Sequence, residues 1–557
     1  MDEEERPESR PLPISRRQLL AAGLAVGSAT ALGACGSGAV STPNPSAAPA
    51  AAAGDLIASA APSATPVASG SAGGGAAASG VPSRSPDAAS PIRAENARKG
   101  DPGWDASRVW GQGSVYLGAA SVGPGEPISV RASGRGVASV EWYRLGWYGG
   151  VGARLVHVDK GVRLGGHPAP TYDRVTGLVE AGWPTALQAT APVGVQSGML
   201  LAVLRDASGR SVANAPIVLR PDPTAPRRAP VLFVSAACTW QAYNQWGGTD
   251  LYGNYGGLPI KATQNHRAAQ VSFDRPYYLD GGAGYLRRWE LQFIRWMERN
   301  GRDVEYIADW DLERNPDLVS GRQLLMMAGH PEYWSRPMRA RVEAAVAAGI
   351  NVAFLTGNEV YWQTRLEDGP AGPGTRITCY KSRTADPIMA TQPSLTTCRW
   401  REAPVSEPEA PLIGQMYGHI VQRVADWVVQ GQGHWLYEGT GLKNGDALAN
   451  LVGQEYDTYF PDLANPGTII LASSPVTADI NNPHDPGAQL SPGIHNATVY
   501  TAQSGATVIA AGTFQWSWAI DSYGDRSYHG VATPVDKRVA RMTRNIFDRL
   551  GDGPLVP

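Results

Sequence analysis

The sequence predicts a two-part protein in which an all-β region precedes an α/β region built on a parallel sheet. Between residues 96 and 223, short runs of alternating apolar and polar residues are broken by Gly and Pro, without a helical period. After residue 229, short apolar runs alternate with amphipathic segments, which is the pattern of βαβ units. We therefore expect an immunoglobulin-like β-sandwich over 96–223 and an α/β domain over 229–557.

The first 35 residues have the features of an export signal. Arg16 and Arg17 precede a short apolar run, and the run ends at residues 32–35 in a sequence that resembles a lipoprotein cleavage box. This run is shorter and richer in Ala and Gly than a membrane-spanning helix. We expect a twin-arginine signal peptide over 1–35 and a lipid on Cys35. The mature chain would then be anchored at the outer face of the cytoplasmic membrane.

A segment of low complexity follows the signal. Residues 36–95 consist mainly of Ala, Ser, Gly and Pro, so they cannot bury enough apolar surface to offset their ordering entropy. We expect a disordered tether. Over the whole chain of 557 residues, 48 Lys and Arg nearly balance 50 Asp and Glu, which argues against a nucleic-acid partner.

The α/β region can be predicted element by element. Four large apolar residues at 324–327 form a buried strand that stops at Gly329, and Ser335 can cap a helix that Gly349 closes. The expected strands are 231–234, 304–307, 324–329 and 351–357, and the expected helices are 289–300, 335–349 and 537–550.

Polar residues follow the ends of these strands. His330 and Glu332 come after the strand at 324–329, Asn358 follows the next strand, and Cys238 and Tyr243 follow the first. Because the carboxyl ends of parallel strands meet at one edge of a sheet, we expect these side chains to lie close together.

This edge could support three kinds of chemistry, or binding alone. Cys238 could act as a nucleophile with His330 as its base, although no tight Gly-x-Cys-x-Gly turn surrounds it. Glu332, His330 and tyrosinate oxygens would form an oxygen-rich set suited to Fe³⁺. The carboxylate and histidine could also perform acid–base chemistry without a metal. In a binding protein the same residues would only be hydrogen-bonded, and spacing alone leaves these alternatives open.

An ordered series of motifs then resembles a known family. The series consists of residues 242–248, 251–252, 271–276, 329–335, 357–358, 452–457 and 515–518. It resembles the C-terminal domain of the large (β) subunit of N,N-dimethylformamidase and its bacterial relatives, over most of residues 229–550. Residues 143–150 resemble the β-domain that precedes this module in many relatives.

The resemblance implies an amidotransferase-like (flavodoxin-like) α/β fold and a mononuclear iron, Fe³⁺, held by two tyrosines and one glutamate. The motifs match these ligands to Tyr243, Tyr252 and Glu332. They match the other residues lining the family's active site to His330 beside the metal, Asn358 as the residue that orients substrate, and Glu455 as the proton-transfer carboxylate.

The function implied by the resemblance is an exported, iron-dependent amidohydrolase that cleaves the C–N bond of a small amide. Fe³⁺ can polarise an amide carbonyl and acidify bound water while a carboxylate moves the proton. Because the characterised enzyme has a small subunit, we also expect an oligomer or a small-subunit partner. The alternative is a catalytically inactive cell-surface module that binds carbohydrate or another ligand on the same fold.

Cys379 and Cys398 are the cysteine pair that we expect to be joined. They flank a loop that contains Asp386 and Pro393, and an exported location permits disulfides. Because the twin-arginine route carries proteins folded in a reducing cytoplasm, this bond would form after export.

Overall fold

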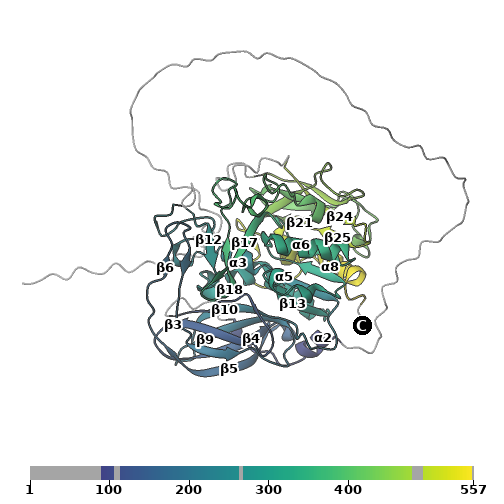
Figure 1. Ribbon diagram of the computed structural model, residues 1–557. Helices are drawn as coiled ribbons and strands as arrows, with labels where there is room; N and C mark the ends of the chain where they lie inside the picture. Colours follow the sequence, from purple (N-terminus) through teal and green to yellow (C-terminus); the bar gives the residue numbers. More distant parts are fainter. Residues whose placement is uncertain (1–89, 106–112, 262–266, 479–492, 555–557) are drawn as a thin grey trace, which may run out of the picture. The chain divides into compact units, whose positions relative to one another are not determined.

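The computed structural model describes residues 90–105, 113–261, 267–478 and 493–554 (Figure 1). Arg16, Arg17 and Cys35 lie outside the described residues, as does nearly all of the expected tether at 36–95. No helix in the described ranges is both long and apolar enough to cross a membrane.

Two mainly antiparallel sheets make up the N-terminal part of the described chain. The sheets hold three and five described strands, in the orders β1-β3-β8 and β2-β10-β9-β4-β5, and only β2 pairs in parallel. Their bounds are β1 Ser114–Tyr116, β2 Ser121–Val122, β3 Pro127–Ser133, β4 Gly136–Leu145, β5 Ala153–Leu164, β8 Leu187–Thr190, β9 Gly198–Arg205 and β10 Ser211–Leu219. The sheets share an apolar core that contains Val130 of β3 and Val140 of β4, both fully buried.

Strand β9 is buried on both of its faces. Leu200 and Leu204 point into the core between the two sheets, whereas Met199, Leu201 and Val203 belong to a larger core shared with the C-terminal part. This double burial explains its continuous apolar sequence, since a strand with one wet face would alternate. The sheets and the rest of the described chain therefore form one compact unit.

The largest sheet is mixed. Among the described residues it has seven strands in the order β13-β11-β14-β16-β25-β24-β23, and the first five run parallel while β24 and β23 pair antiparallel. The bounds are β11 Val231–Ser235, β13 Val304–Ala308, β14 Leu324–Met327, β16 Asn351–Phe354, β23 Ile469–Pro475, β24 Ile494–Thr501 and β25 Thr507–Ala510. Thus β11, β13, β14 and β16 coincide with the four expected strands.

Few long helices accompany this sheet. They are α4 (Leu291–Arg299), α6 (Arg336–Ala347) and α8 (Lys537–Leu550). Ser335 caps α6 as expected, because its hydroxyl accepts the N–H of Met338 at 3.3 Å. Leu324 and its three successors in β14 are fully buried, which is the environment that a continuous apolar run predicts.

The remaining strands form small sheets. The described part of the chain has a four-stranded sheet, β12-β18-β17-β15, and separate antiparallel pairs that include β19 with β22 and β20 with β21. The bounds are β12 Gln270–Ser272, β15 Tyr333–Ser335, β17 Trp362–Gly369, β18 Gly372–Thr378, β19 Met416–Ile420, β20 Ala425–Val428, β21 Ala447–Val452 and β22 Glu455–Thr458.

The predicted fold class is therefore wrong. The chain is β-rich and consists mostly of small mixed and antiparallel sheets, so it is not an amidotransferase-like or flavodoxin-like parallel-sheet domain after an immunoglobulin-like sandwich. The error has a physical cause. Apolar runs predict strands but not the direction in which strands pair, and the βαβ alternation seen before residue 357 does not continue to residue 537.

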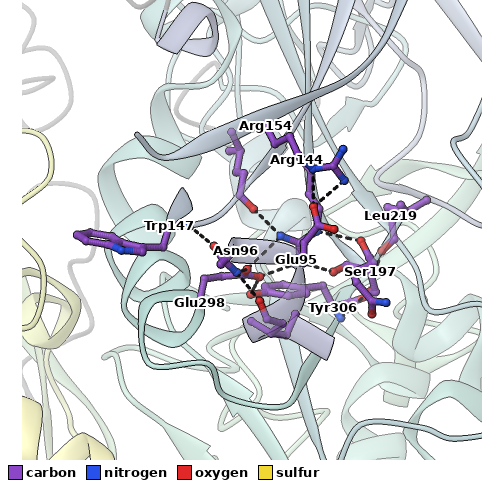
Figure 2. A network of polar contacts seen from close by, with 12 residues as sticks. Glu95, Asn96, Arg144, Trp147, Arg154, Ser197, Leu219, Glu298 and Tyr306 are labelled. Carbon is purple, nitrogen blue, oxygen red and sulfur yellow. Dashed lines mark hydrogen bonds and ion pairs between the residues drawn. The ribbon is translucent and has the colours of Figure 1, made fainter. Parts of the chain in front are cut away.

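A buried ion pair joins the five-stranded sheet to helix α4 (Figure 2). Arg144 of β4 donates two bonds to the carboxylate of Glu298, at 2.8 and 3.0 Å, and both side chains are fully buried. Arg144 also donates to the carbonyls of Gln196 and Ser197, and Tyr306 of β13 donates to Glu298 at 2.8 Å. Because these bonds replace lost hydration, the pair is tolerated in the core.

The short helix α2 (Pro91–Asn96) is attached to the same network (Figure 2). Glu95 accepts bonds from Tyr148 at 2.8 Å and from Arg154 at 2.7 Å. The side-chain oxygen of Asn96 accepts the N–H groups of Trp147 and Tyr148, and its amide donates to Glu298. Helix α2 is thus hydrogen-bonded to the same buried network as the Arg144–Glu298 pair.

Candidate active site

The structure places Glu332 at the centre of a group of phenols. Tyr252 donates to both oxygens of Glu332, at 2.8 and 2.9 Å, and Tyr243 donates to the second oxygen at 3.0 Å. The two tyrosine rings are stacked with their centres 4.4 Å apart, and Tyr333 donates its hydroxyl to that of Tyr252 at 2.6 Å. Nε2 of His330 lies 2.9 Å from the same carboxylate. Two phenols and an imidazole therefore converge on the Glu332 carboxylate.

Local backbone structure fixes this arrangement. Tyr243 ends the short helix α3 (Ala237–Ala242) that follows β11, and Thr239 of that helix accepts the N–H of Glu332 at 3.1 Å. Gly329 has φ +108°, and a Cβ there would lie 2.7 Å from Cγ of Glu290. Only glycine therefore allows the chain to turn sharply between β14 and His330.

Asn358 and Glu455 form the neighbouring part of the site. Nδ2 of Asn358 donates to Glu455 at 2.5 Å, and Asn358 is held at φ +51° directly after Gly357. Burial raises the pKa of Glu455 to about 7, with nearby His330 opposing and Glu332 adding to the shift. A carboxyl with this pKa can both accept and donate a proton near neutral pH.

The charges in the site are strongly coupled. Burial alone would raise the pKa of Glu332, but the His330 and Lys381 cations outweigh it and hold the pKa below its ordinary value. Burial alone would lower the pKa of His330, but Glu332 and Glu455 outweigh it and raise the pKa. Burial, followed by the Glu332 carboxylate, raises the phenol pKa of Tyr243 and of Tyr252 well above the ordinary value. Without a bound cation both phenols are therefore protonated.

Lys381 also belongs to the site, although no sequence pattern predicted it. Its Nζ lies 3.1 Å from the centre of the Tyr252 ring, which is a close cation–π contact, and 5.2 Å from that of Tyr333. Burial lowers the pKa of Lys381 to about 7. Lys381 follows β18 in an irregular segment at φ +52°, so no periodic pattern could have identified it.

An aromatic wall beside His330 was missed as well. The Phe514 ring centre lies 4.2 Å from that of His330, and Trp289 packs edge-on against both His330 and Tyr243. Trp289 belongs to a π-helical turn, η5 (Leu286–Glu290), that precedes α4. The amphipathic pattern predicted a helix there but gave no sign of the extra residue in this turn.

The three cysteines among the described residues lie away from solvent. Cys238 is fully buried, its N–H bonds to Asp309 at 3.1 Å, and burial, followed by Asp309, raises the pKa of its thiol well above the ordinary value. These are the surroundings of an unreactive thiol. Cys379 and Cys398 are free, buried thiols in the structure, and a disulfide formed after export stays a prediction.

The oxygen donors around Glu332 fit a hard cation. The described residues contain no cluster of three or more His, Cys, Asp and Glu side chains able to hold a metal ion, so a metal here would need the tyrosines. The phenol oxygens of Tyr243 and Tyr252 lie 2.8–3.0 Å from the Glu332 carboxylate. Neighbouring ligands around an octahedral ion with bonds of about 2.0–2.1 Å are about 2.9 Å apart, and oxygen-only ligands favour hard ions.

Comparison with known proteins supports the resemblance found from the motifs. The family model described as N,N-dimethylformamidase beta subunit-like, C-terminal, matches residues 139–530. The N,N-dimethylformamidase beta subunit of Paracoccus aminophilus is 24% identical over 312 residues, which are 47% of this chain and 37% of that protein. The chain thus matches little more than a third of that relative's length. Because the family model spans most of the chain, the protein belongs to the N,N-dimethylformamidase beta subunit-like, C-terminal family.

Proposed function

We propose that this protein is an amide hydrolase that cleaves the C–N bond of a small amide, with Fe³⁺ held by Tyr243, Tyr252 and Glu332. The observation that carries the proposal is the convergence of two phenols and a carboxylate beside His330 and the Asn358–Glu455 pair. The relative from Paracoccus aminophilus is named for the hydrolysis of such an amide, which adds support.

The residues around the ligands have separable tasks. When bound, Fe³⁺ would polarise the amide carbonyl and acidify a water molecule. His330, 2.9 Å from Glu332, fixes the orientation of that carboxylate. Glu455 takes the proton of the attacking water as a carboxylate and returns it to the leaving amine as an acid.

Asn358 orients the substrate beside this acid–base group. Its Nδ2 holds Glu455, and among the described residues its buried Oδ1 has no hydrogen-bond partner, so that oxygen can accept a bond from substrate. Phe514 and Trp289 close the site on the side of His330 and exclude water, which strengthens every charge interaction inside it.

The proposal includes the location and the assembly of the protein. The Arg16–Arg17 pair and Cys35 support export by the twin-arginine route and a lipid anchor on the outer face of the cytoplasmic membrane. The Paracoccus relative is a beta subunit, which supports a partner subunit or an oligomer for this chain as well.

The direct test is metal content together with amine release. The full chain, expressed with ample iron, is expected to contain stoichiometric iron and to release amine from N,N-dimethylformamide or another small amide. A folded protein that stays iron-free after reconstitution and releases no amine would overturn the proposal. Ligand binding by such a protein would favour the catalytically inactive module.

Replacing Cys238 with Ser tests the thiol alternative. Because Cys238 is fully buried and a serine hydroxyl can also donate to Asp309, Cys238→Ser is expected to leave amine release within about twofold of wild type. Loss of turnover in a variant that keeps its iron and its circular dichroism spectrum would instead identify Cys238 as the nucleophile.

A further inference from the structure

Strand β22 presents two carboxylates to a single asparagine. Glu455 and Asp457 are two residues apart, so their side chains lie on the same face of the strand. Glu455 accepts the side-chain amide of Asn358 at 2.5 Å, and Asp457 accepts the backbone N–H of Asn358 at 2.9 Å. Glu455 already has a place in the proposed chemistry, whereas Asp457 is buried and has none.

The asparagine held in this way lies in a strained segment. Asn358 and Val360 have φ values of +51° and +54°, a left-handed region that β-branched residues such as Val rarely occupy. The segment has little freedom to relax. A Cβ at Gly357 would lie 3.1 Å from the backbone nitrogen of Thr513, and the N–H of Val360 is bonded to the carbonyl of Pro331 at 2.9 Å. Strain of this kind persists only where surrounding contacts enforce it.

One further side chain, that of Gln415, donates a hydrogen bond to Asp457, and a second carboxyl lies near it. Gln415 donates to the second oxygen of Asp457 at 3.2 Å, and the Glu359 side chain, only 3% exposed, lies nearby. Burial, followed by the Asp457 carboxylate, raises the pKa of Glu359 well above its ordinary value. Asp457 also faces the positive charge of Arg401. Burial nevertheless raises the pKa of Asp457, and the hydrogen bonds and Arg401 oppose that rise.

We propose that Asp457 is a positioning residue: supported by Gln415, it holds the backbone N–H of Asn358 so that the left-handed turn presents the Asn358 side chain to Glu455. The catalytic consequence rests on the proposed amide hydrolysis. The geometric claim concerns this chain alone and can be tested without iron or substrate.

A double-mutant cycle in the iron-free full chain tests the geometric claim. Asp457→Ala removes the bond that holds the turn, whereas Asn358→Gly removes the strain, because glycine adopts φ +51° freely. Asp457→Ala lets the strained turn relax only when Asn358 is present. The loss in folding equilibrium constant caused by Asp457→Ala is therefore expected to be larger, by up to about tenfold, in the Asn358→Gly background. Hydrogen exchange should accelerate at 357–361 in Asp457→Ala. Additive effects, or exchange equal to wild type, would overturn the proposal.

A conservative variant tests the same hydrogen bond if Asp457→Ala does not fold. Asp457→Asn keeps an oxygen that can accept the N–H of Asn358, so it is expected to retain slow exchange at 357–361. Fast exchange in Asp457→Asn would contradict the proposal, because the accepting oxygen is still present in that variant.

Catalysis supplies a separate readout. In iron-loaded protein, Asp457→Ala is expected to lower kcat for amine release at unchanged iron content, and Asp457→Asn to restore most of it. An unchanged kcat would remove the positioning role. If the wild-type chain releases no amine at all, the proposed function fails, while the cycle and the exchange still decide whether Asp457 holds the turn.

Discussion

Replacing Glu332 with Gln is expected to strip the protein of iron while leaving it folded. Glutamine keeps the size of the side chain and an oxygen that can accept from Tyr243 or Tyr252, but it removes the one carboxylate on which both phenols converge. Because loss of even an outer-shell partner lowers metal affinity about 10–100-fold, loss of this ligand should cost about 100-fold or more. Elemental analysis and the tyrosinate-to-iron absorption band measure the effect, and circular dichroism checks the fold.

Matched variants separate ligands from their neighbours. Tyr243→Phe and Tyr252→Phe should each weaken iron binding, because a phenyl ring offers no anionic oxygen. His330→Ala should lower activity while most of the iron remains bound, since His330 contacts the carboxylate through Nε2. If the Glu332→Gln protein contained as much iron as wild type, Glu332 would not be a ligand and the metal site would lie elsewhere.

Replacing Glu298 with Gln is expected to destabilise the whole protein by about 3–5 kcal/mol, because the change leaves the guanidinium of Arg144 buried without its counter-charge. Urea unfolding of the full chain measures the difference. Glu407→Gln is the control: Glu407 is 40% exposed and pairs with Arg336 at the surface, so its loss should cost about 1 kcal/mol or less.

Removal of both charges should be milder than removal of one. The double variant Arg144→Met, Glu298→Gln leaves no unpaired charge in the core, so it is expected to be more stable than Glu298→Gln alone. If Glu298→Gln costs no more than Glu407→Gln, the pair is not the internal link that its geometry indicates.

Much of the site could be anticipated because strand ends are local features. The run at 324–327 predicts a strand, and a strand that stops at Gly329 places His330 and Glu332 at a sheet edge. The structure does bring together Tyr243, Tyr252, His330, Glu332, Asn358 and Glu455, although their catalytic roles stay predictions.

The other features of the site and of the fold depend on contacts between residues that are distant in sequence. Lys381 reaches Tyr252 from an irregular segment, and Phe514 reaches His330 across 184 positions (514 − 330). The antiparallel pairing of β23 and β24 was missed for a related reason, since an apolar run has the same composition in either direction. Likewise, the burial of Asp457 under Asn358 follows from tertiary packing and leaves no trace in local sequence.

The burial of both faces of β9 also indicates which segment of the chain has to be inherited together. The family match begins at residue 139, inside β4, and runs to 530, so it takes in β4, β5, β9 and β10 together with the candidate site. Splitting the gene at the linker near residue 229 would separate Met199, Leu201 and Val203 from the C-terminal residues that pack on them. Recombination at that point would therefore expose apolar side chains on both products. The sheet and the site are thus expected to have been inherited as one piece.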